Sequence, residues 1–235
     1  MTDKGRIYLI PTIISPDTES VVLPPQIFQV IKSLDYFLVE NVRTARRFIS
    51  SLKLGLEIGN LQFELLNKHT SPKDISTLIE PVKAGRSIGV LSESGCPGVA
   101  DPGAMVVEMA HRQSITVVPL VGPSSLLLAL MASGFNGQSF TFHGYLPIDK
   151  NDRVKKIKAL EVAARNGTQI FIETPYRNQQ MFESIVQSCR GDTLLCVAKN
   201  LTAQDSWVKT RSINQWKKNQ PAINKIPVVF LLGRN

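Results

Sequence analysis

The chain has 235 residues, of which 43% are hydrophobic and 20% are charged, a balance typical of a globular protein that buries a sizeable core. No apolar run reaches the roughly 18 residues that a membrane span needs, and the N-terminus lacks the apolar segment of a secretory signal. Cys96, Cys189 and Cys196 are too few and too scattered for a disulfide framework or a paired-cysteine metal site. We therefore expect a reduced, cytoplasmic protein without a metal ion.

The net charge of +8 is unevenly distributed along the chain. Residues 1–121 hold 12 basic and 12 acidic side chains, whereas residues 122–235 hold 15 and 7. Basic residues crowd two short segments, 150–158 and 209–218. A basic half favours an anionic partner, of which a nucleic-acid backbone is the commonest. The alternative is a solvated basic face that only aids solubility.

Strands and helices alternate along the first half. The predicted strands are short apolar runs at residues 6–10, 36–40, 88–91 and 115–120. The predicted helices lie at residues 25–33, 42–52, 72–83 and 102–112. Ser71 and Pro72 are typical of a helix start, because a serine hydroxyl accepts a free backbone N–H and proline presets φ. This alternation predicts a parallel sheet covered by helices.

The same pattern starts again at Gly122. The predicted strands of the second half are residues 140–144, 168–173, 194–200 and 228–233. The predicted helices are residues 124–133, 150–166, 179–189 and 213–218. Gly134 is placed to close the first of these helices in a left-handed conformation. We expect an α/β fold of two domains, residues 1–121 and 122–235, with mostly parallel sheets.

The loop after the strand at 88–91 is the most informative motif. It runs from Ser92 to Gly103 and reads Ser-Glu-Ser-Gly-Cys-Pro-Gly-Val-Ala-Asp-Pro-Gly. Glycines in such a loop let the backbone approach a ligand closely. Ligands of open parallel sheets bind beyond the carboxyl ends of the strands. The loop therefore predicts a small-molecule site.

Two later motifs make this prediction specific: Val121-Gly-Pro-Ser124, and the segment Phe-Thr-Phe-His-Gly-Tyr-Leu-Pro from Phe140 to Pro147. In this order, the three motifs resemble the tetrapyrrole methylase superfamily of S-adenosylmethionine-dependent methyltransferases. Within it, they are most similar to the branch that 2′-O-methylates a ribose of 16S ribosomal RNA. The resemblance covers nearly the whole chain. It implies S-adenosylmethionine as cofactor, a cofactor cleft between two α/β domains, RNA as substrate, and a homodimer.

The resemblance also implies residue roles. The positions that match cofactor-binding segments are Ser92, Gly95, Cys96, Ser124, Ser125, Glu173 and Leu201. The positions assigned to the acceptor are Arg43, Asp101 and Arg177. Plainer roles stay open: the loop residues would only shape turns, Asp101 would cap a helix, and Glu173 and Arg177 would form a surface ion pair.

No catalytic residue is assigned by the sequence. A ribose hydroxyl is a poor nucleophile, so a base should take its proton as the methyl group arrives. Glu40, Glu93 and Asp101 are candidates, because each lies at a strand end or in a loop.

Isolated polar and aromatic residues receive structural interpretations. His143 is interpreted as a partly buried, hydrogen-bonded residue, and Cys96 as a small polar wall residue of its loop and not a nucleophile. Trp207 and Trp216 flank basic residues, as a base-stacking surface does. Core packing is the interpretation preferred for both.

Several segments depart from the RNA-modifying branch. Ser15 and Pro16 stand where that branch has Gly-Asn, Asn41 replaces an acid, and residues 199–203 lose an acid and a base. These changes fall on loops expected to face the acceptor, so two alternatives stay open. One is methylation of a tetrapyrrole or another small molecule, and the other is an inactive RNA-binding relative. A dinucleotide oxidoreductase is disfavoured, because no Gly-x-Gly-x-x-Gly follows the first strand.

Overall fold

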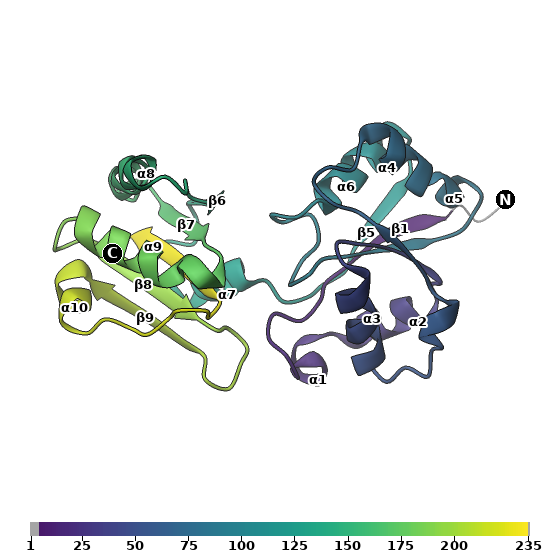
Figure 1. The fold of residues 1–235 in the computed structure, drawn as a ribbon, viewed down its shortest axis with the longest axis horizontal. Helices are drawn as coiled ribbons and strands as arrows, with labels where there is room; N and C mark the ends of the chain where they lie inside the picture. The colour runs from purple at the N-terminus through teal and green to yellow at the C-terminus, as the bar shows by residue number, and fades with distance from the viewer. Residues whose placement is uncertain (1–4, 235) are drawn as a thin grey trace. The chain divides into compact units, whose positions relative to one another are not determined.

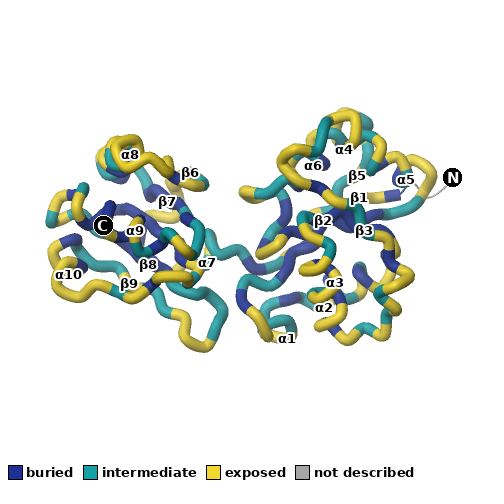
Figure 2. The backbone as a smooth tube through the Cα atoms, in the orientation of Figure 1, coloured by how far each residue is buried: buried dark blue, intermediate teal, exposed yellow. Residues whose placement is uncertain are grey.

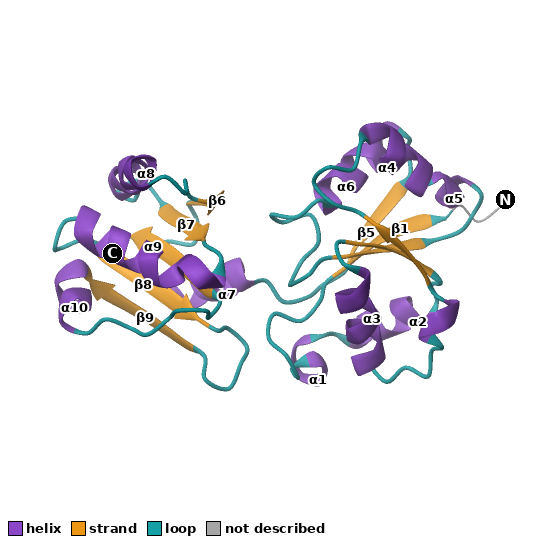
Figure 3. Ribbon diagram, in the orientation of Figure 1, coloured by secondary structure: helices purple, strands orange, loops and turns teal. Residues whose placement is uncertain are grey.

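The computed structural model describes residues 5–234. The chain divides into two compact units between Ser124 and Ser125. Each unit contains one five-stranded sheet with helices packed on it (Figure 1, Figure 3). The predicted α/β class is therefore confirmed.

The first unit is built on a parallel sheet in the order β3-β2-β4-β1-β5. Its strands are β1 (Arg6–Ile10), β2 (Tyr36–Val39), β3 (Gln62–Leu65), β4 (Ile88–Leu91) and β5 (Thr116–Pro119). Since all five strands run in one direction, the loops that follow them lie along one edge of the sheet. The motif loop at 92–103 leaves β4 at this edge.

Both faces of this sheet are covered, because successive residues of a strand point to opposite faces. Phe37 and Val39 pack against α2 (Pro25–Lys32) and α3 (Val42–Ser51) on one face. Tyr36 and Leu38 pack on the other face, under the helices α4 (Pro72–Leu78), α5 (Glu80–Lys83) and α6 (Gly103–Arg112). Figure 2 shows the resulting buried sheet between exposed outer surfaces. The short elements α1 (Glu19–Val22) and η1 (Ile58–Asn60) complete the unit.

The helix starts follow the local sequence. Ser71 and Asp74 form a reciprocal capping box at α4, as the Ser-Pro start predicts. The predicted helix 72–83 is instead two helices that meet at Ile79. Pro81 explains the break, because it lacks the N–H that would bond the carbonyl four residues earlier.

The second unit contains a mixed sheet in the order β6-β7-β10-β8-β9. Its strands are β6 (Phe140–Tyr145), β7 (Thr168–Ile172), β8 (Leu194–Lys199), β9 (Trp207–Ser212) and β10 (Val228–Gly233). Only β6 and β7 pair in parallel, and the other three pairs are antiparallel. The expectation of mostly parallel sheets is therefore wrong for this unit. A parallel pair needs a long crossover, which α8 (Lys150–Ala163) supplies between β6 and β7, whereas the short loop between β8 and β9 allows only an antiparallel turn.

Helices also cover both faces of the second sheet. Helix α7 (Ser125–Ser133) packs on one face. The helices α8, α9 (Asn178–Ser188) and α10 (Ile213–Lys218) cover the other, and the one-turn η2 (Pro175–Arg177) precedes α9. Gly134 follows α7 with φ +75°, which confirms the predicted left-handed cap.

The two tryptophans and His143, for which the sequence favours structural roles, lie where those roles require. Trp216 is buried and donates its indole N–H to the Leu195 carbonyl at 2.9 Å, and Trp207 packs beside it. His143 is partly buried and hydrogen-bonds Gln169 at 2.7 Å. The core and hydrogen-bonded roles of these three residues are confirmed.

The sequence pattern did not delimit β3 and β9. Both are edge strands, and both mix charged with apolar residues instead of forming an apolar run. In the described part of the chain, no helix has the length and apolarity to cross a membrane.

Candidate functional site

The loops after β1 and β4 are joined directly at the carboxyl edge of the first sheet. The Thr12 N–H donates to the Gly95 carbonyl at 2.9 Å. The Thr12 hydroxyl donates to the Ser92 carbonyl at 3.3 Å. Because β1 and β4 are neighbours in the sheet, these bonds hold the motif loop against the loop that carries residues 11–17.

Within the motif loop, Ser92 and Gly95 form a tight turn. The buried Ser92 hydroxyl donates to the Gly95 carbonyl at 2.9 Å. Gly95 has φ +73°, and a Cβ added to it would lie 3.2 Å from the Pro123 carbonyl oxygen. A side chain at this position would therefore be strained and crowded, which leaves a bare backbone surface at the loop.

Cys96 brings the motif loop against the turn after β5. Its Sγ lies 3.4 Å from the Pro123 carbonyl oxygen. Burial, reinforced by the negative charge of Asp101, raises the pKa of the Cys96 thiol above its usual value. A raised pKa leaves little thiolate near neutral pH, which argues against a nucleophile. Ser124 follows this turn, and Ser125 is the first residue of α7 in the second unit.

Asp101 braces the far end of the motif loop. One carboxylate oxygen accepts the backbone N–H groups of Gly98 and Gly103, both at 2.7 Å. Burial raises the pKa of Asp101 although these two hydrogen bonds oppose the shift. Pro102, and not Asp101, occupies the cap position of α6, so the expected capping role is corrected to a loop brace that reaches the first helical N–H.

Glu40, Glu93 and Asp101 lie at the same end of the sheet. The Glu93 N–H donates to a Glu40 carboxylate oxygen at 3.3 Å. Burial raises the pKa of Glu40 although the hydrogen bond from the Glu93 N–H opposes the shift, and the negative charges of Asp101 and Glu93 add to the rise. The structure therefore brings together the three carboxyl groups named as candidates for the general base.

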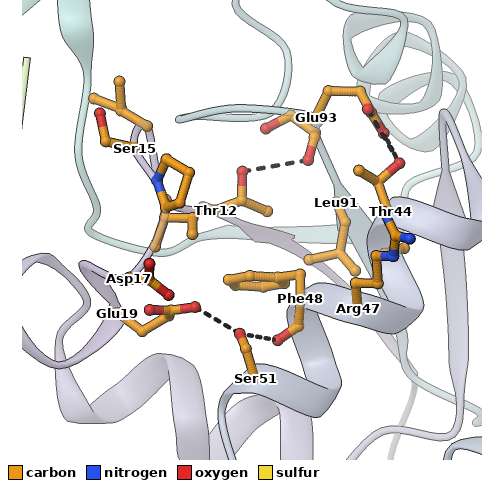
Figure 4. Close-up of a pocket in the computed structure, with 15 residues that line it drawn as sticks. Thr12, Ser15, Asp17, Glu19, Thr44, Arg47, Phe48, Ser51, Leu91 and Glu93 are labelled. Carbon is orange, nitrogen blue, oxygen red and sulfur yellow. Dashed lines mark hydrogen bonds between the residues drawn. The ribbon is translucent and has the colours of Figure 1, made fainter. Parts of the chain in front are cut away.

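A pocket of about 450 Å³ opens beside these loops (Figure 4), a size typical of small-molecule sites. We call it the α3 pocket. Its wall consists of Thr12, Ile13, Ile14, Ser15, Pro16, Asp17, Glu19, Thr44, Ala45, Arg47, Phe48, Ser51, Leu91, Ser92 and Glu93.

Sequence reasoning missed the α3 side of this pocket. Thr44, Arg47 and Ser51 recur at helical spacing, with Phe48 beside Arg47, so all four fall on one face of α3. The helical spacing of these residues could have indicated a shared face of α3. From the sequence alone, however, that face cannot be told from an ordinary amphipathic helix face.

Asn41, the residue that replaces an acid of the RNA-modifying branch, caps α3. Its side-chain oxygen accepts the N–H groups of Arg43 at 2.9 Å and Thr44 at 3.3 Å. Arg43 is exposed in the first turn of the helix.

The second unit holds the other residues expected at the site. Glu173 has a side chain only 2% exposed, and its carboxylate accepts from the Arg177 guanidinium at 2.6 Å. The Arg177 side chain is 31% exposed, so this ion pair joins a buried carboxylate to a half-buried guanidinium and is not a fully exposed surface pair. Leu201 is partly buried in the loop that joins β8 and β9.

One residue of the basic segment 150–158 is not available to a partner. Arg153 is 4% exposed and donates to the Ser184 hydroxyl at 3.1 Å and the Ile148 carbonyl at 2.8 Å. The exposed cations of this segment are Lys150, Lys155 and Lys158.

Three similar curated proteins carry the name ribosomal RNA small subunit methyltransferase I. The Vibrio cholerae protein is 28% identical over 196 residues, which are 83% of this chain and 65% of that protein. The Bacillus subtilis protein is 30% identical over 86% of this chain and 65% of its own length. The Thermotoga maritima protein is 30% identical over 74% of both chains. The chain thus spans about two thirds of the length of the first two relatives, and no family model matches it.

Solved structures share the fold at low identity. The methyltransferase CobJ superposes with a TM-score of 0.63 at 16% identity and covers 98% of this chain and 94% of its own. Uroporphyrin-III C-methyltransferase from Thermus thermophilus, in complex with S-adenosylhomocysteine, gives a TM-score of 0.58 at 17% identity and covers 98% of both chains. At such identities the likeness concerns the fold alone.

Proposed function

We propose, since the chain belongs to the ribosomal RNA small subunit methyltransferase I family of the tetrapyrrole methylase superfamily, that it transfers a methyl group from S-adenosylmethionine to a ribose 2′-oxygen of ribosomal RNA. The observation that carries the proposal is the meeting of two family motifs in the first unit. Gly95 and Cys96 of the motif loop pack on Pro123 of the turn after β5.

The residues proposed to hold the cofactor are the positions that match cofactor-binding segments of the superfamily: Ser92, Gly95, Cys96, Ser124, Ser125, Glu173 and Leu201. The glycine backbone at Gly95 fits a close ligand, because an added Cβ would fill the space near Pro123. The carboxylates of Glu40, Glu93 and Asp101 fit a cationic sulfonium electrostatically.

The bound cofactor supplies a methyl group on a positively charged sulfur, which is already activated for displacement. The protein has to exclude water, align the ribose oxygen and accept its proton as the new C–O bond forms and the C–S bond breaks. One oxygen of Asp101 already holds two backbone N–H groups. Glu40 and Glu93 are therefore the better candidates for the base, and the raised pKa of Glu40 brings it nearer to neutral pH.

The charge around the α3 pocket bears on the choice of acceptor. Asp17, Glu19 and Glu93 line it, and carboxylates repel a polycarboxylate such as uroporphyrin. The excess of cations in the second half suits a polyanion. The acidic pocket therefore argues against a polycarboxylate seated inside it, and the cations of the second half are available to the phosphates of RNA.

Calorimetric titration with S-adenosylmethionine tests the donor site. We expect the wild-type protein to bind it and Gly95→Trp to abolish binding. Gly55→Trp is the matched control, since Gly55 has a similar φ of +75° in the same unit but nothing within 4 Å of its added Cβ. Absence of binding to the wild-type protein would refute the methyltransferase proposal.

Labelled cofactor and small ribosomal subunits from a strain that lacks this protein test the acceptor. We expect label in a ribose of the RNA and binding that weakens steeply with salt. Binding of RNA without any transfer of label would identify an inactive relative instead.

The cellular setting follows from the proposed substrate. A protein that modifies ribosomal RNA works where ribosomes are assembled, so we propose a cytoplasmic enzyme. The resemblance to the superfamily supports a homodimer, and light scattering of the purified protein tests that assembly.

A further inference from the structure

We infer that the RNA backbone docks on a cationic surface of the second unit, formed by β9 and the last turn of α10, which contains none of the residues proposed to hold the donor. This surface consists of Lys209, Arg211, Lys217 and Lys218, and we call it the β9–α10 strip. The inference rests on the proposed function, which supplies RNA as the partner. It adds where the RNA is anchored and by which chemistry.

The strip joins an edge strand to the helix that follows it. Strand β9 is the edge strand of the second sheet, and Lys209 and Arg211 point to the same face because alternate residues of a strand do so. Helix α10 follows at once, with Ser212 as its N-cap, and Lys217 and Lys218 lie in its last turn. Figure 1 shows α10 next to the end of β9. The four cations therefore come from adjoining elements.

Two tryptophans orient the cations of β9. The Lys209 ammonium lies 4.9 Å from the ring centroid of Trp207, and the Arg211 guanidinium lies 5.2 Å from that of Trp216. The two ring centroids are 6.4 Å apart. Trp216 is buried, and Trp207 is partly buried with Lys209 over its ring. The strip therefore presents positive charges to a partner and no open platform on which a base could stack.

The strip cations have no acidic partner in the described part of the chain. None of the four forms an ion pair with a described residue. The sequence contains no acid after Asp205, which pairs with Lys199 at 2.6 Å. Asp192, which precedes β8, pairs with Arg190 at 3.2 Å. Because each phosphodiester carries one negative charge, a nucleic-acid backbone suits a row of unpaired cations.

The other basic segment, residues 150–158 of α8, differs from the strip in this respect. Arg153 is buried, and Lys155 pairs with Asp152 at 3.5 Å. Helix α8 contains a second acid, Glu161. Its positive charge is thus partly neutralised or hidden, and the strip is the stronger anchor for a polyanion.

Plainer roles exist for single members of the strip. Lysine on an edge strand discourages pairing with another sheet, and lysine in the last turn of a helix stabilises the helix dipole. Neither role accounts for the absence of acids from the whole stretch 206–235. Neither role predicts affinity for RNA, so a binding experiment separates them from the inference.

The salt dependence of RNA binding tests the strip directly. The logarithm of the affinity for a single strand falls with the logarithm of the salt concentration, with a slope of about 0.7 for each phosphate that is neutralised. Fluorescence anisotropy with a labelled single-stranded RNA of mixed sequence measures this slope. We expect it to decrease by about 2 when three strip lysines are removed. The strip variant carries Lys209→Gln, Lys217→Gln and Lys218→Gln, and it keeps Arg211 because that side chain packs over Trp216.

The matched control removes three lysines of α8 from the same unit. All six lysines concerned are exposed, so the two variants change the charge equally. The control variant carries Lys150→Gln, Lys155→Gln and Lys158→Gln. It should keep the wild-type slope. An unchanged slope in the strip variant, or equal decreases in both variants, would overturn the inference.

Titration with S-adenosylmethionine and transfer of label to ribosomal subunits separate the two levels. The strip variant should bind the cofactor as tightly as the wild-type protein does. If the wild-type protein methylates ribosomal RNA but the strip variant keeps its slope, only the strip assignment fails. If the wild-type protein neither binds the cofactor nor transfers label, the proposed function fails, while a reduced slope in the strip variant would still support the strip. A wild-type protein that does not bind RNA would overturn both.

Discussion

The motif loop at 92–103 and the α3 pocket lie side by side but use their polar groups differently. In the loop, Ser92 and Asp101 bond backbone atoms of the loop itself. In the pocket, Asp17 and Arg47 have no such partner among the described residues. The loop is thus held in its conformation by its own hydrogen bonds, whereas Asp17 and Arg47 line the pocket without a partner among the described residues.

This difference separates two kinds of functional residue. Polar groups that are satisfied internally maintain a backbone geometry, and their removal costs stability. Polar groups that lack a partner contribute little to folding and are available to a ligand. Substitutions in the motif loop should therefore lower mainly the stability, and substitutions in the pocket should change mainly ligand binding.

Gly122→Ala should give the largest effect, by disrupting the packing behind the motif loop. An added Cβ would lie 2.2 Å from the Pro11 Cβ and 2.5 Å from its Cγ, and a proline ring cannot rotate away. We expect a loss of about 3 kcal/mol in the free energy of unfolding, at the upper end of overpacking costs. Urea denaturation measures it.

Gly59→Ala is the control for this prediction. Gly59 lies in the same unit and has nothing within 4 Å of an added Cβ, so its stability should change by less than about 1 kcal/mol. Equal stabilities of the two variants would show that the turn relaxes around the methyl group.

Asp101→Ala compared with Asp17→Ala tests the contrast between loop and pocket directly. Removal of Asp101 leaves the N–H groups of Gly98 and Gly103 without their acceptor, so we expect a loss of about 2 kcal/mol. Removal of Asp17 breaks no such bond and should change stability by about 0.5 kcal/mol or less.

Thermal unfolding of the two variants provides the measurement. Asp17→Ala should unfold close to the wild-type temperature, and Asp101→Ala well below it. A large loss of stability in Asp17→Ala would contradict the view that the pocket contributes little to folding.

Glu40→Gln should have a small effect on stability whose size depends on pH. Because burial raises the pKa of Glu40 above its usual 4.5, the folded state binds this proton more tightly than the unfolded state does. That contribution is fully present below pH 4.5 and is lost as the pH rises through the folded pKa. Glutamine keeps an acceptor for the Glu93 N–H and does not titrate.

The variant should therefore gain stability relative to wild type as the pH rises from below 4.5 to neutrality. Melting temperatures of both proteins across this range measure the gain. A difference that stays constant with pH would mean that Glu40 is not destabilised by its surroundings.

Much of the fold could be predicted from local patterns. The apolar runs at Ile88–Leu91 and Val228–Gly233 are strands, because a strand buried on both faces has to be continuously apolar. The Ser71 start formed its capping box. The edge strands β3 and β9 escaped detection, because charged and polar residues interrupt their apolar pattern and make each look like a loop.

The candidate site divides in the same way. The motif loop could be found from its glycines and prolines, since these residues restrict backbone geometry locally. The α3 pocket could not, because its wall combines residues 12–19 with residues 44–51 and 91–93. Which of these side chains would face one another depends on the strand order β2-β4-β1.

The sequence by itself determined the α/β class, the superfamily and the loops proposed to hold the donor, because turn chemistry and apolar periodicity act over a few neighbouring residues. Only the tertiary structure decided the antiparallel pairs of the second sheet, the burial of Arg153 and Glu173, and the unpaired groups of the α3 pocket. These features depend on which distant segments pack together, and burial then sets the cost of every polar group that lacks a partner.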